Sequence, residues 1–315
     1  MNNQKRTPKQ YALIAVKGMA MGAADVVPGV SGGTIAFITG IYDELLGALK
    51  NCTPAALLLW KEQGFKAFWQ HINGGFLLAL FTGILLSLKT FAAVIESALQ
   101  THPILVWAFF FGLIIASVVL LARHIPRWRW RDALAMLIGM AIVIAISLAS
   151  PAQLPGYWWV MFLGGFIAIC AMILPGISGS FLLLLAGLYP VFLGAINNLE
   201  WLLLLSFGAG AVCGLLSFSR VLSWLLATYH QLTVATLIGF LVGSLNVTWP
   251  WKEPVVTMLD RHGETIVVQS SNVLPARYAE VMAQSPETSM AILCVVVGVL
   301  LVLVTEFVAA KFGKN

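Results

Sequence analysis

Two short clusters of serine, glycine and threonine stand where long apolar segments begin, at residues 31–34 and 178–180. If a helix begins at such a cluster, its first backbone N–H groups are unpaired and its dipole places positive charge there. Glycine lets a bulky anion approach the backbone, and hydroxyl groups add hydrogen-bond donors. Phosphate and carboxylate groups bind in this geometry. The predicted binding residues are Ser31, Gly32, Gly33, Thr34, Ser178, Gly179 and Ser180.

Two basic residues are candidates for holding the same anion. Lys89 and Arg220 each lie within the first long apolar segment that follows a cluster. A charge at that depth of a membrane is costly, so it usually faces a cavity or a partner. Together the two side chains would place one cation near each cluster. The alternatives are that these side chains extend to the membrane surface, or that Lys89 pairs with Glu96.

Two acidic residues also lie in apolar surroundings. Asp25 precedes the first cluster, where the second copy of the motif has Met172, and Glu306 lies late in the last apolar segment. Either carboxylate could carry a coupling proton or neutralise a nearby cation. The alternative for both is a plain carboxylate close to the membrane surface.

Enzymatic chemistry has little support in the sequence. There is no H-E-x-x-H motif, no Walker loop and no G-x-S-x-G elbow. The five histidines fall mostly in loops and form no metal-ligand spacing. We therefore expect neither a catalytic residue nor a metal or cofactor.

The composition indicates a polytopic integral membrane protein. The chain has 315 residues, of which 60% are hydrophobic and 10% charged, against about 25% charged in soluble domains. Crossing the hydrocarbon layer takes about 20 apolar residues. The net charge of +5 is explained by basic cytoplasmic loops rather than by nucleic acid. The apolar segments are 11–27, 30–49, 74–99, 103–122, 132–150, 157–174, 177–196, 201–228, 232–248 and 289–311.

Two neighbouring pairs of these segments are separated only by a Pro-Gly break. The pair 11–27 and 30–49 is broken at Pro28-Gly29, and the pair 157–174 and 177–196 at Pro175-Gly176. Proline and glycine interrupt a helix, and neither linker is long enough to leave the membrane. Irregular backbone at that depth is tolerated only inside the protein or beside a wet cavity. The sequence predicts a re-entrant hairpin for each pair, with a broken spanning helix as the alternative.

The chain contains an internal repeat. Residues 28–49 align without a gap with residues 175–196, and nine of 22 positions are identical. The similarity continues downstream at an offset of 127, so each copy holds one hairpin and three spans. Three is odd, so the second copy enters the membrane upside down, which is typical of secondary transporters with a site near the midplane. The alternative is a duplication retained for helix packing, with each cluster a simple N-cap.

The predicted fold is therefore an all-α polytopic membrane protein with an inverted-topology repeat. We expect a cytoplasmic tail at 1–10, a first repeat at 11–150, a second at 151–315, and an extracytoplasmic loop at 249–288. This topology leaves thirteen of the 18 Lys and Arg residues inside and three outside, as the positive-inside rule requires. The loop contains a strand-like run at 264–269. Aromatic belts are expected at Tyr157, Trp158, Trp159, Trp249 and Trp251 outside and at Trp128 and Trp130 inside.

At the two breaks the chain resembles the PopT-type polyprenyl-phosphate transporters, a prokaryotic membrane family. The resemblance lies in Asp25-Val-Val-Pro-Gly-Val-Ser-Gly-Gly-Thr34 with Gly40-Ile-Tyr42, and in Leu174-Pro-Gly-Ile-Ser-Gly-Ser180 with Gly187-Leu-Tyr189. It covers roughly residues 10–310. It implies a flippase in the bacterial cytoplasmic membrane that recycles undecaprenyl phosphate for cell-wall synthesis.

Three functions are compatible with these patterns. The main one is a polyprenyl-phosphate flippase, which needs an anion site at the hairpin tips and a lateral opening for the tail. The second is a carrier of a small soluble anion, which needs a closed pocket. The third is a non-transporting accessory protein of envelope synthesis. Expected partners are the lipid substrate and the bilayer; a coupling proton or sodium ion and a homo-oligomer stay open.

Overall fold

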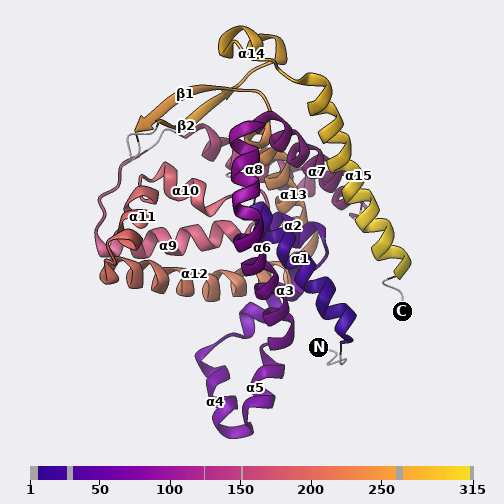
Figure 1. The fold of residues 1–315 in the computed structure, drawn as a ribbon. Coiled ribbons are helices and arrows are strands. Elements are labelled where there is room, and N and C mark those ends of the chain that lie inside the picture. Colours follow the sequence, from indigo (N-terminus) through magenta and orange to yellow (C-terminus); the bar gives the residue numbers. More distant parts are fainter. Residues whose placement is uncertain (1–5, 27–30, 124, 150–151, 260–264, 313–315) are drawn as a thin grey trace.

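The computed structural model describes residues 6–26, 31–123, 125–149, 152–259 and 265–312, and this part of the chain forms fifteen helices and one two-stranded sheet (Figure 1). The first half contains α1 (Pro8–Val26), α2 (Gly32–Ile38), α3 (Tyr42–Asn51), α4 (Pro54–Gln63), α5 (Phe65–His71), α6 (Gly74–Thr101), α7 (Pro103–Arg123) and α8 (Trp130–Leu148). The second half contains α9 (Trp158–Ile173), α10 (Gly179–Leu185), α11 (Tyr189–Asn197), α12 (Trp201–Thr228), α13 (His230–Thr248), β1 (Lys252–Leu259), β2 (Thr265–Asn272), α14 (Pro275–Met282) and α15 (Thr288–Phe312).

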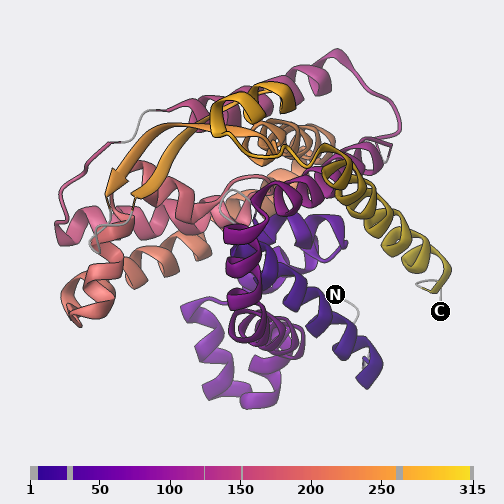
Figure 2. The ribbon, with the colours of Figure 1, turned by 45° about the horizontal axis from the view of Figure 1, so that its top comes forward.

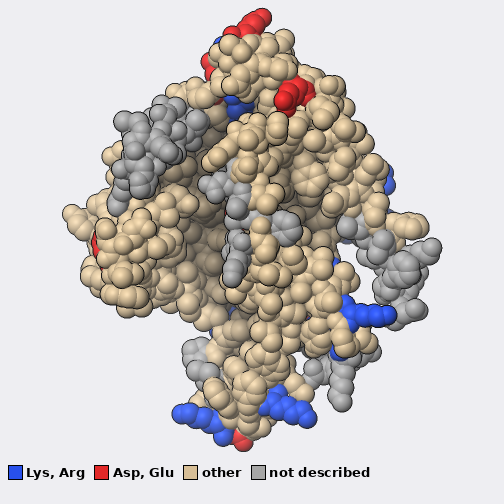
Figure 3. Space-filling model, in the orientation of Figure 1, with Lys and Arg blue, Asp and Glu red and all other residues tan. Residues whose placement is uncertain are grey.

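The long helices are suited to a membrane. Among the described residues, α7, α8, α12 and α13 are each long and apolar enough to cross one. The number rises to six if two bent pairs each count as one span: α5 with the first half of α6, bent by 67°, and α10 with α11, bent by 102°. Six predicted spans agree within two residues at each end with single long helices, namely α6, α7, α8, α12, α13 and α15. The surface in Figure 3 is consistent with a membrane protein, because its middle shows almost no Lys, Arg, Asp or Glu.

The expectation of a purely α-helical chain is wrong at the segment 249–288. There β1 and β2 pair antiparallel, with Lys252 opposite Asn272, and α14 follows. The alternating run at 264–269 contributes the start of β2, because alternation suits a strand with one covered face. Figure 2 shows the sheet and α14 lying across one end of the helices.

Two tryptophans predicted for the outer aromatic belt, Trp249 and Trp251, make contacts within the protein. Trp251 is buried with Ile104 and Tyr278, and its indole nitrogen donates to the Pro286 carbonyl at 2.8 Å. Trp249 is half-buried and donates to the Val273 carbonyl at 2.9 Å. Both rings therefore hold the loop onto the helix ends, because a buried indole N–H needs an acceptor.

The second arm of each predicted hairpin is broken once more. The apolar segment 30–49 forms α2 and α3, and 177–196 forms α10 and α11. The breaks fall at Gly40 (φ +71°) and Gly187 (φ +69°), in the left-handed region that favours glycine. Between the predicted apolar segments 30–49 and 74–99 the chain forms α4 and α5, which project from the body in Figure 1.

Glycines bring α1 against α6, and α9 against α12, in the same way. A Cβ added at Gly18 would lie 2.2 Å from the Leu80 carbonyl oxygen, and one added at Gly165 would lie 2.2 Å from that of Phe207. In the reverse direction, a Cβ at Gly83 would lie 2.0 Å from the Ala15 oxygen. Its counterpart, at Gly210, would lie 1.9 Å from the Phe162 oxygen. Every residue of the second pair follows its counterpart by 147 or 127 positions.

The remaining long helices pair across the two halves. α7 packs on α15, and α13 packs on α8. A Cβ at Gly112 would lie 2.1 Å from the Val295 oxygen, and a Cβ at Gly239 would lie 2.1 Å from the Met136 oxygen. These contacts correspond to each other when α8 is matched to α15 at an offset of 159. Each half therefore supplies a helix that packs against the other half.

Candidate functional site

The cluster that follows the first break lies against the second break inside the protein, although the two are about 140 residues apart. The Ser31 hydroxyl donates to the Met172 carbonyl at 3.0 Å, and the Gly176 N–H donates to the Thr34 hydroxyl oxygen at 2.8 Å. The Tyr42 hydroxyl donates to the Ile173 carbonyl at 3.0 Å. Residues 27–30, which include Pro28 and Gly29, lie outside the described residues.

The first cluster is closed in this arrangement. Ser31 caps α2 by accepting from the Gly33 N–H at 3.1 Å, and both Ser31 and Thr34 are only 1% exposed. A Cβ at Gly33 would lie 2.6 Å from the Met172 oxygen, so only glycine fits this approach. An anion could reach these hydroxyl groups only if the bonds to the second break opened.

Asp25 is near the end of α1, and its carboxylate lies at the beginning of α2. Its Oδ1 accepts from the Gly32 N–H at 2.7 Å. The carboxylate therefore occupies a backbone donor that a bound anion would use. The prediction that Asp25 balances charge or couples an ion is untested and stays a prediction.

The second cluster is arranged differently. Ser178 caps α10 by accepting from the Phe181 N–H at 3.4 Å, and its hydroxyl lies 3.0 Å from that of Ser180. A Cβ at Gly179 would lie 2.4 Å from the Ala168 oxygen. Ser180 is exposed, whereas Ser178 is buried. Of the two clusters, the second is the one with an accessible hydroxyl.

Of the two predicted cations, the structure describes only the side chain of Arg220, and it is not bonded to either cluster. Arg220 is exposed on α12, and its Nη1 donates to the Leu216 carbonyl of the same helix at 3.1 Å. No recorded hydrogen bond or ion pair among the described residues joins it to either cluster. The side chains of Lys89, on α6, and Glu306, on α15, lie outside the described part. Their proposed roles stay predictions.

Two further residues support the first cluster and were not selected from sequence as site residues. The Lys17 ammonium donates to the Thr39 carbonyl at the end of α2, at 2.8 Å. Tyr42 joins α3 to the second break, as described above. The signal for Tyr42 was its identity with Tyr189 in the repeat. Lys17 has no such signal in the sequence.

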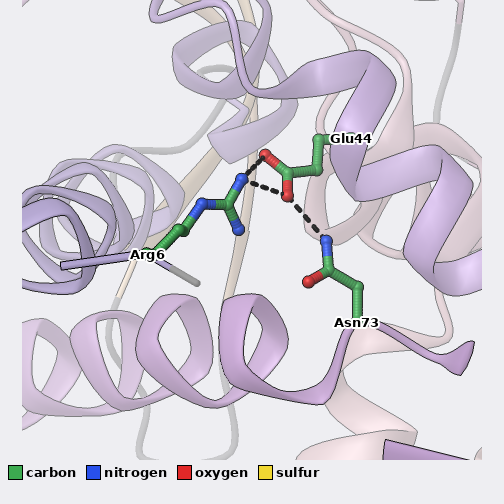
Figure 4. Close-up of polar contacts among 3 residues, drawn as sticks. All are labelled: Arg6, Glu44 and Asn73. Atoms are coloured by element: carbon green, nitrogen blue, oxygen red, sulfur yellow. Dashed lines mark hydrogen bonds and ion pairs between the residues drawn. The ribbon is translucent and has the colours of Figure 1, made fainter. Parts of the chain in front are cut away.

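In each broken pair, the second arm returns to the chain that precedes the first arm. Arg6 Nη2 contacts the two Glu44 carboxylate oxygens at 2.5 and 2.7 Å, and Asn73 Nδ2 donates to Glu44 at 2.6 Å (Figure 4). These residues come from the chain before α1, from α3 and from the chain before α6. In the second pair, the Ala152 N–H donates to the Leu185 carbonyl at 2.7 Å, which joins the chain before α9 to the end of α10.

Helical spans combined with two broken pairs are typical of multi-pass membrane transporters. The chain belongs to the undecaprenyl phosphate translocase-like (VCA0040-like) family, whose model matches residues 21–266. This confirms the family resemblance inferred from the two breaks.

Two relatives illustrate the match. The chain is 44% identical over 301 residues to a polyprenyl-phosphate transporter of Vibrio cholerae, covering 96% of this chain and 98% of the relative. It is 32% identical over 257 residues to a polyprenyl-phosphate transporter of Staphylococcus aureus, covering 75% of this chain and 85% of the relative. No solved structure matches the chain significantly.

Proposed function

We propose that this protein is a flippase that returns undecaprenyl phosphate, or a related polyprenyl phosphate, across the bacterial cytoplasmic membrane for reuse in cell-wall synthesis. The observation that carries the proposal is the match over 96% of the chain to a polyprenyl-phosphate transporter. The matched family region, 21–266, includes both breaks. A cluster and a break that lie together suit a phosphate head group, because irregular backbone inside a membrane protein exposes polar groups only where it is shielded from lipid.

In this proposal the two halves are inverted repeats, and each broken pair is re-entrant. The recurring glycine contacts at fixed offsets support the repeat. The contacts of Glu44 with Arg6 and Asn73 support re-entry of the first pair, because the chain before α1 and the chain before α6 both lie at α3. Both termini then lie in the cytoplasm and the loop 249–288 outside.

The head group is held where the first cluster lies against the second break. Ser178, Gly179 and Ser180 form the accessible side of this site, and residues 31–34 form the closed side. Lys89 and Arg220 supply cations when they turn toward the centre. The isoprenoid tail stays in lipid while the head group passes from one cluster to the other.

Passage of the head group requires the cross-break bonds to open. Ser31 and Thr34 then exchange the Met172 carbonyl and the Gly176 N–H for the phosphate oxygens. Asp25 must release the Gly32 N–H at the same step. A proton or sodium ion that neutralises Asp25, with Glu306 as the second carboxylate, would couple this release to an ion gradient.

The test is transport of undecaprenyl phosphate by the purified protein in proteoliposomes. Wild type is compared with Ser180→Ala and Arg220→Ala, and with Ser206→Ala, whose exposed hydroxyl only bonds the Leu202 carbonyl of its own helix. We expect at least about a tenfold loss in the first two variants and none in the control, since a charge-assisted phosphate contact is worth on the order of 1.5–3 kcal/mol.

Two outcomes would contradict the proposal. Uptake of inorganic phosphate without lipid transport would indicate a soluble-anion carrier. Wild-type protein that moves neither, with or without an ion gradient, would indicate an accessory protein.

A further inference from the structure

A cavity of about 290 Å³ lies between α3 and the junction of α12 with α13. Its size is close to the lower end of the range for small-ligand sites. The cavity forms because α3 of the first half packs against α12 of the second. It is lined by Asp43, Leu46, Gly47, Lys50, Ser223, Leu226, Ala227 and His230.

The polar lining of this cavity has unused hydrogen-bonding capacity. The Ser223 hydroxyl is buried and has no hydrogen-bond partner among the described residues, and leaving a buried hydroxyl unpaired is unfavourable. Lys50 and His230 are exposed and take part in neither of the two ion pairs recorded among the described residues. Asp43 is the acidic residue of the lining. A ligand that accepts hydrogen bonds and carries negative charge would satisfy Ser223 and Lys50 together.

The cations belong to one end of the molecule only. At the repeat offsets of 147 and 127, Lys50 corresponds to Asn197, His230 to Pro103, and Ser223 to Glu96. The equivalent position at the other end therefore has an amide, a proline and a carboxylate in their place, so the lysine charge and both hydrogen-bond donors of the cavity are absent there. In the proposed topology the cavity opens on the cytoplasmic side.

We propose that this cavity is a second anion site, which binds the phosphate group of a phosphomonoester on the cytoplasmic side. Lys50 supplies the charge, Ser223 donates its hydroxyl hydrogen, and His230 donates a ring N–H. Leu46 and Leu226 offer an apolar wall for the first carbons of a lipid chain. The inference rests on the proposed function, because it assigns this cavity to the cytoplasmic end of the same transport route.

Lysine footprinting of the full chain in detergent tests the site directly. The protein is acylated with an N-hydroxysuccinimide ester in the presence of farnesyl phosphate, farnesol or inorganic phosphate, and labelling is quantified by mass spectrometry. Lys61 and Lys66, exposed on α4 and α5, are internal controls. We expect farnesyl phosphate at ten times its Kd to slow labelling of Lys50 about tenfold, with no change at the controls and no protection by farnesol.

Inorganic phosphate distinguishes the source of the ligand. Protection of Lys50 by farnesyl phosphate alone assigns the site to a lipid head group, and equal protection by inorganic phosphate assigns it to free phosphate. Either result supports an anion site. Labelling of Lys50 at the same rate in all samples would overturn it.

Variants separate the charge from the fold. Affinity is read from protection of His230 against diethyl pyrocarbonate. We expect Lys50→Gln to weaken farnesyl phosphate binding about tenfold and Ser223→Ala about threefold, whereas Lys50→Arg and the control Lys61→Gln stay near wild type. If wild type transports undecaprenyl phosphate and Lys50→Gln binds and transports equally well, this site is refuted and the proposed function stands. If wild type transports no polyprenyl phosphate, the proposed function itself fails.

Discussion

At the scale of single residues, the most informative contact is that between Asp25 and the Gly32 N–H. A carboxylate here and a phosphate dianion would repel each other and compete for the same donor. The structure therefore gives Asp25 a specific role to test, which its position in the sequence alone did not.

Replacing Asp25 by Asn removes the charge and keeps an oxygen that can accept from Gly32. We expect Asp25→Asn to bind farnesyl phosphate about threefold to tenfold more tightly, since one repulsion in a partly wet site is worth on the order of 1 kcal/mol. Transport should also lose its dependence on an imposed ion gradient. If Asp25 is only a helix cap, affinity and gradient dependence will match wild type, and thermal stability alone will change.

Lys252, in the segment 249–288, is a half-buried cation with a measurable consequence. Its ammonium donates to the Val247 carbonyl and lies 4.0 Å from the Trp107 ring centroid, and burial lowers its pKa to about 8. In the unfolded chain the pKa returns to about 10.5, so the unfolded state binds more protons between these two values. The free energy of unfolding should therefore rise as pH increases from about 8 to about 10.5.

Thermal unfolding of wild type and Lys252→Met across this pH range measures the effect. The variant should lose the rise and should be more stable than wild type at pH 7, because it buries no unpaired charge. Lys61→Met, at an exposed position on α4, is the control and should keep the wild-type profile. A rise of equal size in Lys252→Met would show that another group is responsible.

At the scale of elements, close helix packing depends on particular glycines rather than on glycine content. α12 offers a matched pair: a Cβ at Gly210 would lie 1.9 Å from the Phe162 oxygen, whereas a Cβ at Gly208 would have no neighbour within 4 Å. In Gly210→Ala, α9 and α12 must separate. By the same argument, Gly83→Ala should force α1 and α6 apart.

We expect Gly210→Ala to lower the free energy of unfolding by about 1–3 kcal/mol or more, because overpacking shifts backbone. Gly208→Ala should be neutral or stabilising by up to about 1 kcal/mol, since alanine favours helix. The thermal midpoint of each purified variant in one detergent measures both. Equal effects of the two substitutions would contradict the packing argument.

At the scale of the whole molecule, the two halves are joined because each packs a long helix against a helix of the other. α7 is held by α15, and α13 by α8, so the halves cannot separate without breaking glycine-mediated contacts. A transport cycle then has to move the broken pairs relative to this shared set of helices. The two clusters already differ: one is closed by cross-break bonds and the other has an exposed hydroxyl.

Labelling of single cysteines tests the topology on which this depends. In a chain whose four native cysteines are replaced, Asn197→Cys should react with an impermeant maleimide on intact cells, and Lys50→Cys should react only after permeabilisation. Both positions are exposed in the structure, so access depends on the side of the membrane. Labelling of position 50 from outside would mean that the first broken pair spans the membrane.

The sequence alone was enough to predict the family, the membrane class, the six long helices and the two Pro-Gly breaks. These properties are local, since they depend on apolar length, on residues that interrupt a helix, and on a repeat that can be aligned. The second arm of each broken pair also contains a glycine where it breaks again, Gly40 or Gly187. Glycine alone does not identify such a turn, because the turn depends on its φ angle.

Only the tertiary structure decided that the first cluster lies against the second break, that Asp25 holds the Gly32 N–H, and that α3 and α12 enclose a cavity around Ser223. It also decided that Trp251 packs against Ile104 and Tyr278 and that Arg220 donates to the Leu216 carbonyl of its own helix. Contacts between residues more than a hundred positions apart have no local pattern in the chain. They arise from how the helices pack, and that packing depends on the whole set of helices at once.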